Sequence, residues 1–309
     1  MMSKYYFAYG SNLNLKDFAE RCESGDLTCD RKASDPLKPV CRAYLPDRKL
    51  VFSRKLSRRT GGALDIQPDI GCHVPGMIFE VDDSGWKSLD WKEGAPDIYH
   101  RIDAVAITED GHELPVVTYE VVQELRKEFV EPSAAYFEVV RQGLEDFGLD
   151  DSPLLAAAGK CRRPGAVDGL FVYGTLMRGE RRHGLIPREQ IECVTSAETS
   201  GRLADLEDYP GLILPGRGQR VLGEFIRLRS SAEVLKKLDR VEGFYGFGNP
   251  NSLFRRILVE VEVGGGYATR VWAYVLNQIP ERALVIASGD WREHQAAISR
   301  QEEQLEPAG

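Results

Sequence analysis

The feature that most constrains the fold of this chain is an internal repeat. An apolar, aromatic run that ends in Tyr9-Gly10-Ser11 recurs in the second half, where it ends in Tyr173-Gly174-Thr175. Aromatic residues before the glycine favour a strand, and glycine permits the tight turn that an anion-binding loop of backbone N–H groups requires. The sequence therefore predicts two strands that each end in the same kind of turn, although a single copy would fit a strand exit with core tyrosines equally well.

Four further pairs of segments repeat in the same order along the chain. They are the runs 74–81 and 221–228, the motifs Leu89-Asp90-x-x-Glu93-Gly94 and Leu238-Asp239-x-x-Glu242-Gly243, the clusters 99–101 and 254–256, and the runs 117–121 and 271–275. Ordered repetition of this kind indicates duplicated domains. We expect one domain over 1–150, a linker over 151–167 that is rich in turn residues, and a second domain with a C-terminal tail over 168–309.

Local patterns within each half predict a mixed α+β fold. Ser133 is a candidate N-cap for an amphipathic helix that ends before Gly148, and Ser84 is a candidate cap for a helix that ends at Glu93. Ser230 or Ser231 plays the same part before Glu242. Strand-like runs flank these helices irregularly and do not alternate with them, so a doubly wound parallel sheet is not expected.

Composition excludes several classes of function. The 309 residues carry a net charge of −8, which argues against a general nucleic-acid or anionic-membrane surface. The basic run from Arg54 to Arg59 has no interleaved aromatic residues, so we interpret it as a solvated loop. No segment approaches the ~20 apolar residues of a membrane-spanning helix, and no leader is evident, so we expect a cytoplasmic protein.

The cysteines and histidines predict no metal site. Six cysteines lie far apart without a Cys-x-x-Cys pair, and five histidines include none at metal-binding spacing. Free, reduced thiols are expected: Cys22, Cys29, Cys41, Cys72, Cys161 and Cys193.

Glu93 and Glu242 are the candidate proton-transfer groups. A carboxylate at a helix C-terminus faces the negative end of the helix dipole, which raises its pKa toward neutral pH. A single glutamate before glycine would indicate only a solvated helix end, but its recurrence behind each turn favours function. Ser11 is an alternative nucleophile, although no Gly-x-Ser-x-Gly elbow surrounds it and Thr175 replaces it in the other half.

These motifs resemble those of the γ-glutamylcyclotransferases. In the first half the resemblance covers 5–149 and includes the run from Tyr6 to Leu13, Gly61-Gly62, Glu93-Gly94, Tyr99-x-Arg101 and Pro132-Ser133-x-x-Tyr136. The second half, over about 169–292, resembles the γ-glutamylamine cyclotransferase branch through Tyr173-Gly174-Thr175, Tyr209-Pro210-Gly211, Glu242-Gly243 and Ser288-Gly289-Asp290-Trp291.

The resemblance implies a small mixed β-barrel with flanking helices in each domain. It also implies that Glu93 and Glu242 are the acid/base groups, that no cofactor is needed, and that a small γ-glutamyl amine or peptide is cyclised to 5-oxoproline with release of the amine. The implied substrate-binding residues are Tyr6, Phe7, Ala8, Tyr9, Gly10, Ser11, Asn12, Tyr136, Tyr173, Gly174, Thr175 and Leu176.

Departures from the pattern keep other functions open. The second half has Phe254 where the first has Tyr99, lacks the Pro-Ser-x-x-Tyr motif, and inserts residues 246–250 after its Glu-Gly pair. A non-catalytic γ-glutamyl-binding or scaffold protein, or a protein with only one active domain, is therefore an alternative. Hydrolysis through Ser11 is a third class, and it predicts free glutamate as the product.

Overall fold

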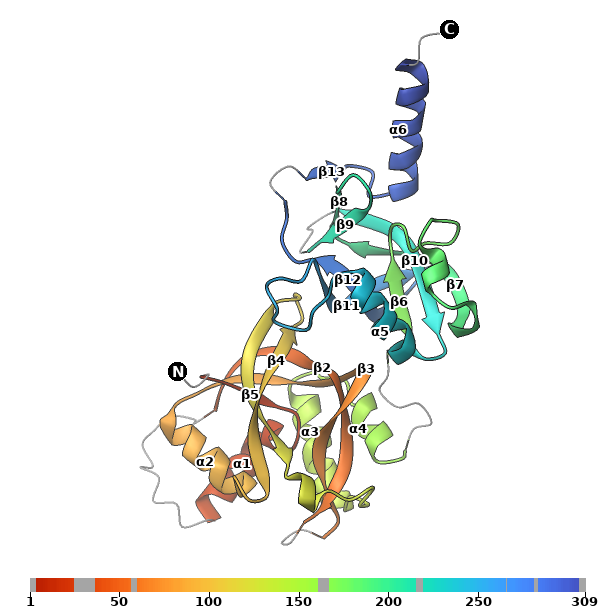
Figure 1. The fold of residues 1–309 in the computed structure, drawn as a ribbon. Helices are drawn as coiled ribbons and strands as arrows, with labels where there is room; N and C mark the ends of the chain where they lie inside the picture. Colours follow the sequence, from red (N-terminus) through yellow and green to blue (C-terminus); the bar gives the residue numbers. More distant parts are fainter. Residues whose placement is uncertain are drawn as a thin grey trace. The chain divides into compact units, whose positions relative to one another are not determined.

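The chain folds into two compact units, residues 1–166 and 167–309 (Figure 1). The computed structural model describes residues 4–24, 37–56, 60–160, 167–214, 219–264, 266–280 and 283–305. Of the predicted linker, residues 152–157 form the short helix α4 (Ser152–Ala157) of the first unit, and residues 161–166 lie outside the described residues.

A closed five-stranded barrel forms the first unit. The strand order is β1-β3-β2-β4-β5, and β1 closes the barrel by pairing parallel to β5 and antiparallel to β3. The barrel is therefore mixed, as predicted. Its strands are β1 (Tyr5–Ala8), β2 (Leu37–Lys55), β3 (Gly62–Val81), β4 (Tyr99–Thr108) and β5 (Glu113–Val121).

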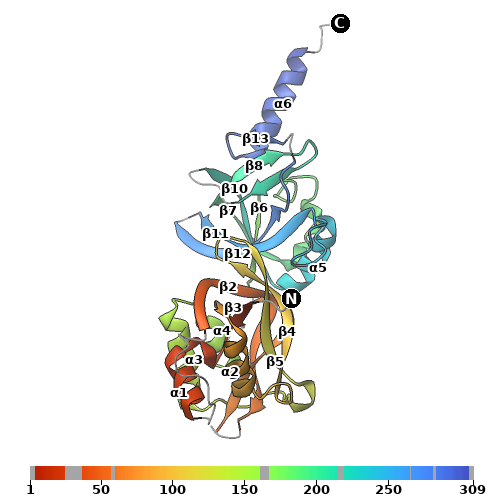
Figure 2. The same cartoon turned by 90° about the vertical axis from the view of Figure 1, so that its left-hand side faces the viewer.

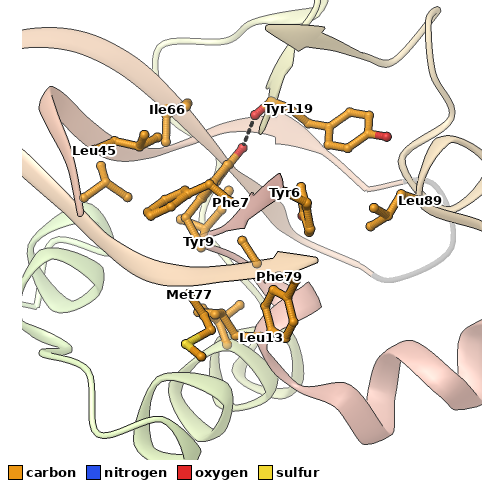
Figure 3. Packing of buried hydrophobic residues seen from close by; sticks show 14 of the residues in the cluster. Tyr6, Phe7, Tyr9, Leu13, Leu45, Ile66, Met77, Phe79, Leu89 and Tyr119 are labelled. Atoms are coloured by element: carbon orange, nitrogen blue, oxygen red, sulfur yellow. Dashed lines mark hydrogen bonds between the residues drawn. The ribbon is translucent and has the colours of Figure 1, made fainter. Parts of the chain in front are cut away.

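Aromatic and aliphatic side chains from these strands fill the barrel and the space under its helices (Figure 3). Phe7, Ile66 and Phe79 are fully buried there, together with Leu89 from helix α2. Burial of such side chains contributes about 1.5–3 kcal/mol each. Around this core lie η1 (Ser11–Leu13), α1 (Leu15–Ser24), α2 (Asp83–Glu93), η2 (Gln123–Leu125), α3 (Ala134–Asp146) and α4 (Figure 2).

The helix caps follow the predicted chemistry with one correction. Ser133 caps α3 by accepting a hydrogen bond from the Tyr136 N–H, and Gly148 after the helix has a φ of 62°. The predicted cap of α2 at Ser84 is wrong. Asp82 caps this helix, because its carboxylate accepts a 2.7 Å hydrogen bond from the Gly85 N–H and complements the positive end of the helix dipole.

The second unit repeats the barrel with the same connectivity. Its closed order is β10-β6-β12-β11-β7, and β6 pairs parallel to β12 and antiparallel to β10, as β1 does with β5 and β3. The predicted duplication is confirmed. The barrel strands are β6 (Gly169–Val172), β7 (Ile191–Ser200), β10 (Arg220–Leu228), β11 (Phe254–Val263) and β12 (Tyr267–Leu276).

A small antiparallel sheet and several helices complete the second unit. The sheet has the order β13-β8-β9, from β8 (Arg202–Asp205), β9 (Pro210–Ile213) and β13 (Leu284–Ile286). The helices are η3 (His183–Leu185), η4 (Arg188–Gln190), α5 (Ser231–Val241) and α6 (Trp291–Leu305). Ser230 occupies the N-cap position of α5, one of the two predicted positions, but its side chain makes no capping hydrogen bond. Within the described ranges, no helix is long and apolar enough to cross a membrane.

Candidate active site

In both units the strand with the repeated tyrosine leads into a tight turn. The Leu13 N–H donates to the Gly10 carbonyl at 3.0 Å, and the Met177 N–H donates to the Gly174 carbonyl at 2.9 Å. The first amides of such a turn have no acceptor inside it. That these turns bind an anion through their backbone N–H groups stays a prediction.

The two turn tyrosines are anchored in the same way. The Tyr9 hydroxyl donates to the backbone oxygen of Tyr119 at 2.8 Å (Figure 3), and the Tyr173 hydroxyl donates to that of Tyr274 at 2.7 Å. Tyr9 and Tyr173 are 6% and 7% exposed. Their hydroxyls thus hold the turn on the barrel. This is the role expected of core tyrosines at a simple strand exit.

Glu93 ends helix α2 and faces the first turn. Gly94 follows it with a φ of 64°, so the chain reverses direction without a steric penalty. The Asn12 side chain bridges the two elements, because its Nδ2 donates to Glu93 Oε1 at 2.7 Å and to the Tyr6 hydroxyl at 2.8 Å. The turn and the helix-terminal glutamate are therefore in direct contact.

Opposing effects act on the pKa of Glu93. Burial raises this pKa above its ordinary value, whereas the nearby charge of Lys92, the hydrogen bond from Asn12 and the charges of Arg54 and Arg21 lower it. Burial is the larger effect, so the carboxyl group is a better proton acceptor than an exposed glutamate.

A cavity of about 260 Å³ opens beside this contact. It brings together three predicted site residues, Ser11, Glu93 and Tyr136, from η1, α2 and α3. The Tyr136 hydroxyl also accepts a 3.4 Å hydrogen bond from the Leu64 N–H. The cavity is lined by Ser11, Asp17, Arg21, Arg54, Leu56, Ala63, Trp91, Lys92, Glu93, Gly94, Ile98, Tyr99 and Tyr136.

Charged residues that the sequence reasoning missed line the same cavity. Arg54 lies at the end of β2 with its guanidinium 5.5 Å from the Tyr99 ring centre, so the interpretation of Arg54 as part of a solvated loop is wrong. Residues 57–59 of that run lie outside the described residues. Lys92 forms a 3.6 Å ion pair with Asp17 of α1. No local pattern marks these residues, because helix and strand ends far apart in the chain assemble them.

The side chains of Phe7 and Ala8 lie in the core next to the first turn. Their side chains are 0% exposed in the core and do not line the cavity, since β1 pairs there with β3. Tyr6 is also buried and reaches the site only through Asn12. These three residues support the turn from behind.

The equivalent glutamate of the second unit is more deeply buried. Glu242 is 8% exposed at the end of α5, and Gly243 follows it with a φ of 59°. Burial raises the pKa of Glu242 to about 7, and the charge of Arg182 opposes this rise. The backbone N–H of Arg182 donates to the Thr175 carbonyl at 2.8 Å, so this arginine is attached to the turn.

The cavity beside Glu242 is much smaller, about 30 Å³. It nevertheless joins the predicted residues of this half, the turn and the glutamate. Its lining consists of Phe171, Val172, Tyr173, Gly174, Thr175, Leu176, Arg182, Tyr209, Pro210, Glu242 and Tyr274. Phe254 and Tyr99 occupy the same place in their hairpins, opposite Leu276 and Val121. Tyr99 donates a hydrogen bond to the Leu64 carbonyl at 2.8 Å, which a phenylalanine cannot do.

Four of the six cysteines lie in the part of the chain that the structure describes. Cys22, Cys41, Cys72 and Cys193 are free thiols, and Cys29 and Cys161 lie outside the described residues. No three His, Cys, Asp or Glu side chains among the described residues converge in a way that could hold a metal ion.

Comparisons with known proteins match both halves to one family. The family model described as gamma-glutamyl cyclotransferase, AIG2-like, matches residues 170–293, and the model described as AIG2-like family matches residues 73–152. The gamma-L-glutamyl-butirosin B gamma-glutamyl cyclotransferase of Niallia circulans is 36% identical over 126 residues, which are 40% of this chain and 76% of that protein.

Solved structures give similar matches. A gamma-glutamyl cyclotransferase structure is 26% identical, covers 52% of this chain and 88% of that chain, and has a TM-score of 0.40. An AIG2-like protein from Mus musculus is 26% identical, covers 37% of this chain and 81% of that chain, and has a TM-score of 0.30.

Two mixed barrels, each with a helix-terminal glutamate beside a Tyr-Gly turn, define a duplicated cyclotransferase-like protein. With the sequence matches in both halves, the chain belongs to the γ-glutamyl cyclotransferase family and carries two of its domains in tandem.

Proposed function

We propose that this protein converts γ-glutamyl amines or peptides into 5-oxoproline and the free amine, with Glu93 and Glu242 as the acid/base groups. One observation carries the proposal: in each unit the glutamate and the turn line one cavity. A turn that presents backbone N–H groups suits a γ-glutamyl group, which offers a carboxylate and a carbonyl oxygen. Burial raises the pKa of both carboxyl groups, to about 7 for Glu242, which favours proton transfer.

The reaction balances with a single carboxylate. The neutral α-amine of the substrate attacks its own γ-carbonyl carbon and passes one proton to the glutamate as the new C–N bond forms. The original amide C–N bond then breaks, and the glutamate returns this proton to the departing nitrogen. The products are 5-oxoproline and an amine, with no net change in bound protons.

Positioning supplies much of the rate enhancement in this scheme. The attack closes a five-membered ring, so holding the γ-glutamyl chain in its folded rotamer can contribute about 7–11 kcal/mol. Backbone N–H groups of the turn stabilise the oxyanion that develops on the carbonyl. In the first unit, Arg21, Arg54 and Lys92 add positive charge to the cavity wall.

A binding role without turnover is a second candidate for the second unit alone. Its cavity of about 30 Å³ has room for roughly one water molecule, so a γ-glutamyl group enters only if the pocket opens. Calorimetry on a Glu93→Gln variant with a γ-glutamyl amide distinguishes the two roles. Two binding equivalents per chain without 5-oxoproline release would assign binding alone to this unit, because the intact first turn accounts for one equivalent.

The decisive experiment for catalysis replaces each glutamate with the uncharged isostere. We expect Glu93→Gln and Glu242→Gln each to lower the rate of 5-oxoproline release by one unit at least ~100-fold, because the amide cannot accept the proton. The double variant should release no 5-oxoproline from any γ-glutamyl amine in a substrate panel. Chromatographic detection of 5-oxoproline and of the released amine provides the measurement.

Glu138→Gln serves as the matched control, because Glu138 lies on the exposed surface of α3, where it pairs with Arg141. Undiminished 5-oxoproline release by the double variant would refute the assigned role of the glutamates. Free glutamate in place of 5-oxoproline would instead indicate hydrolysis and would bring back Ser11 as the nucleophile.

A further inference from the structure

A cluster of three polar side chains lies one helical turn from Glu93. The Asp90 carboxylate accepts hydrogen bonds from the Tyr119 hydroxyl at 2.7 Å and from Arg101 Nε and Nη2 at 2.8 and 2.7 Å. The Arg101 guanidinium also lies 4.3 Å from the centre of the Trp86 ring. Arg101 and Tyr119 are therefore tied to the helix that carries the glutamate.

The second unit contains the same cluster. Asp239 accepts hydrogen bonds from the Tyr274 hydroxyl at 2.7 Å and from Arg256 Nε at 2.9 Å. Arg256 is 1% exposed and lies about 5 Å from the centres of the Phe244, Phe247 and Trp272 rings. Burying an arginine side chain costs free energy unless its charge is paired, and Asp239 provides that pairing in the second unit.

Register places the two clusters at equivalent positions. Arg101 faces Tyr119 across β4 and β5, and Arg256 faces Tyr274 across β11 and β12. In each unit the aspartate precedes the glutamate by three residues, which is about one turn along the helix. The two clusters therefore have the same arrangement, although the sequences around them differ.

Each cluster also connects to the turn through one residue. The backbone oxygen of Tyr119 accepts the Tyr9 hydroxyl, and that of Tyr274 accepts the Tyr173 hydroxyl. The side chain of this strand tyrosine holds the helix, and its main chain holds the turn.

We propose that Tyr119 and Tyr274 are positioning residues that set the distance between the N–H groups of the turn and the acid/base glutamate. Each acts through its hydroxyl on the aspartate of the helix, and the arginine completes the clamp. The expected change in kcat rests on the proposed function, whereas the expected effect on the position of the helix end does not. A shift of about 1 Å in a catalytic group can cost on the order of 100-fold in rate.

The kinetic test uses Tyr119→Phe in a Glu242→Gln background, so that only the first unit turns over substrate. Phenylalanine keeps the ring and the backbone carbonyl but removes the hydroxyl bond to Asp90. We expect kcat to fall by about 10- to 100-fold and KM to change by less than about twofold, because substrate contacts remain while the proton path lengthens.

Thr118→Val is the matched control on the same strand. It removes a buried 2.8 Å hydrogen bond from Thr118 Oγ1 to the Phe7 carbonyl and leaves helix α2 untouched. A decrease in kcat for Thr118→Val as large as that for Tyr119→Phe would overturn the proposal, as would an unchanged kcat in Tyr119→Phe.

Hydrogen exchange supplies a readout that needs no activity. In the Tyr119→Phe protein, the amides of residues 91–95, 97 and 98 at the end of α2 should exchange at least about tenfold faster than in the parent, and those of α3 should not change. Tyr274→Phe should do the same at 240–244 and leave the first unit unchanged. Unchanged exchange at both helix ends would overturn the proposal even if the parent enzyme is active. If exchange becomes faster although the parent protein releases no 5-oxoproline, the positioning role of the tyrosine is supported and the proposed function fails.

Discussion

At the scale of single residues, the two glutamates share a position but differ in environment. Glu93 accepts a hydrogen bond from Asn12 and lies near Lys92, Arg54 and Arg21, all of which favour its charged form. Glu242 is buried with Arg182 as the nearby charge that opposes the effect of burial. Desolvation without compensating partners raises a carboxyl pKa most, so the two sites should titrate differently.

This difference predicts how stability depends on pH at Glu242. Between the ordinary glutamate pKa and a folded-state pKa of about 7, the unfolded chain releases a proton that the folded chain retains. The contribution of Glu242 to stability is therefore complete in acid and is lost as pH rises to about 7. We expect Glu242→Gln to gain on the order of 2–3 kcal/mol relative to the parent protein between about pH 5 and about pH 8.

Denaturant unfolding of both proteins at the two pH values measures this gain. Glu189→Gln is the control, because Glu189 is exposed in η4 of the same unit. If the stability difference between Glu242→Gln and the parent protein did not change with pH, Glu242 would have the pKa of an ordinary exposed glutamate.

At the scale of elements, one glycine in each barrel lets the turn strand pack closely on its neighbour. A Cβ on Gly76 of β3 would lie 2.3 Å from the Ala8 carbonyl oxygen, and one on Gly223 of β10 would lie 2.3 Å from the Val172 carbonyl oxygen. Both oxygens belong to the last residue of the strand that enters the turn. The repeated glycine that the sequence shows at this place therefore serves the position of the turn.

Replacing Gly223 with alanine should strain the barrel next to the turn. We expect Gly223→Ala to lower the free energy of unfolding by about 1–3 kcal/mol, because backbone rather than a flexible side chain blocks the new methyl group. Thermal unfolding measures the loss. Gly184→Ala in the same unit is the control, since nothing lies within 4 Å of its Cβ. Equal stability of the two variants would show that β6 can move away from β10 at little cost.

At the scale of the whole molecule, the chain consists of two units that each close a barrel. Each barrel pairs its first strand in parallel with its last barrel strand, β1 with β5 and β6 with β12, so no barrel strand is borrowed from the other unit. Closed barrels leave no unpaired edge that would need a partner.

We therefore expect residues 1–166 and 167–309 to fold when they are produced separately. Each should give a cooperative thermal transition by circular dichroism, because each has its own closed barrel and buried core. A screen of γ-glutamyl amines against each unit should then reveal two substrate profiles whose sum reproduces that of the full chain. An unfolded spectrum for either unit alone would contradict this independence.

Much of this architecture could be predicted because it depends on local sequence. The repeated Tyr-Gly turn, the helix ending in Glu-Gly and the cap at Ser133 are read from neighbouring residues, and the structure places them as expected. The cap at Asp82 was missed because Asp82, Asp83 and Ser84 follow one another and each is a residue type that can cap a helix. The burial of the Phe7 and Ala8 side chains could not be read from the motif, because a motif does not tell which of its residues point into the core.

Order and spacing along the chain are enough to show that two copies of one fold exist and that Glu93 and Glu242 follow equivalent turns. The folded chain was needed to show that Asn12 contacts Glu93, that Arg54 lines the cavity beside it, and that the second cavity is about 30 Å³. The physical reason is distance along the chain: these contacts join residues whose proximity depends on barrel closure, and no local pattern encodes it.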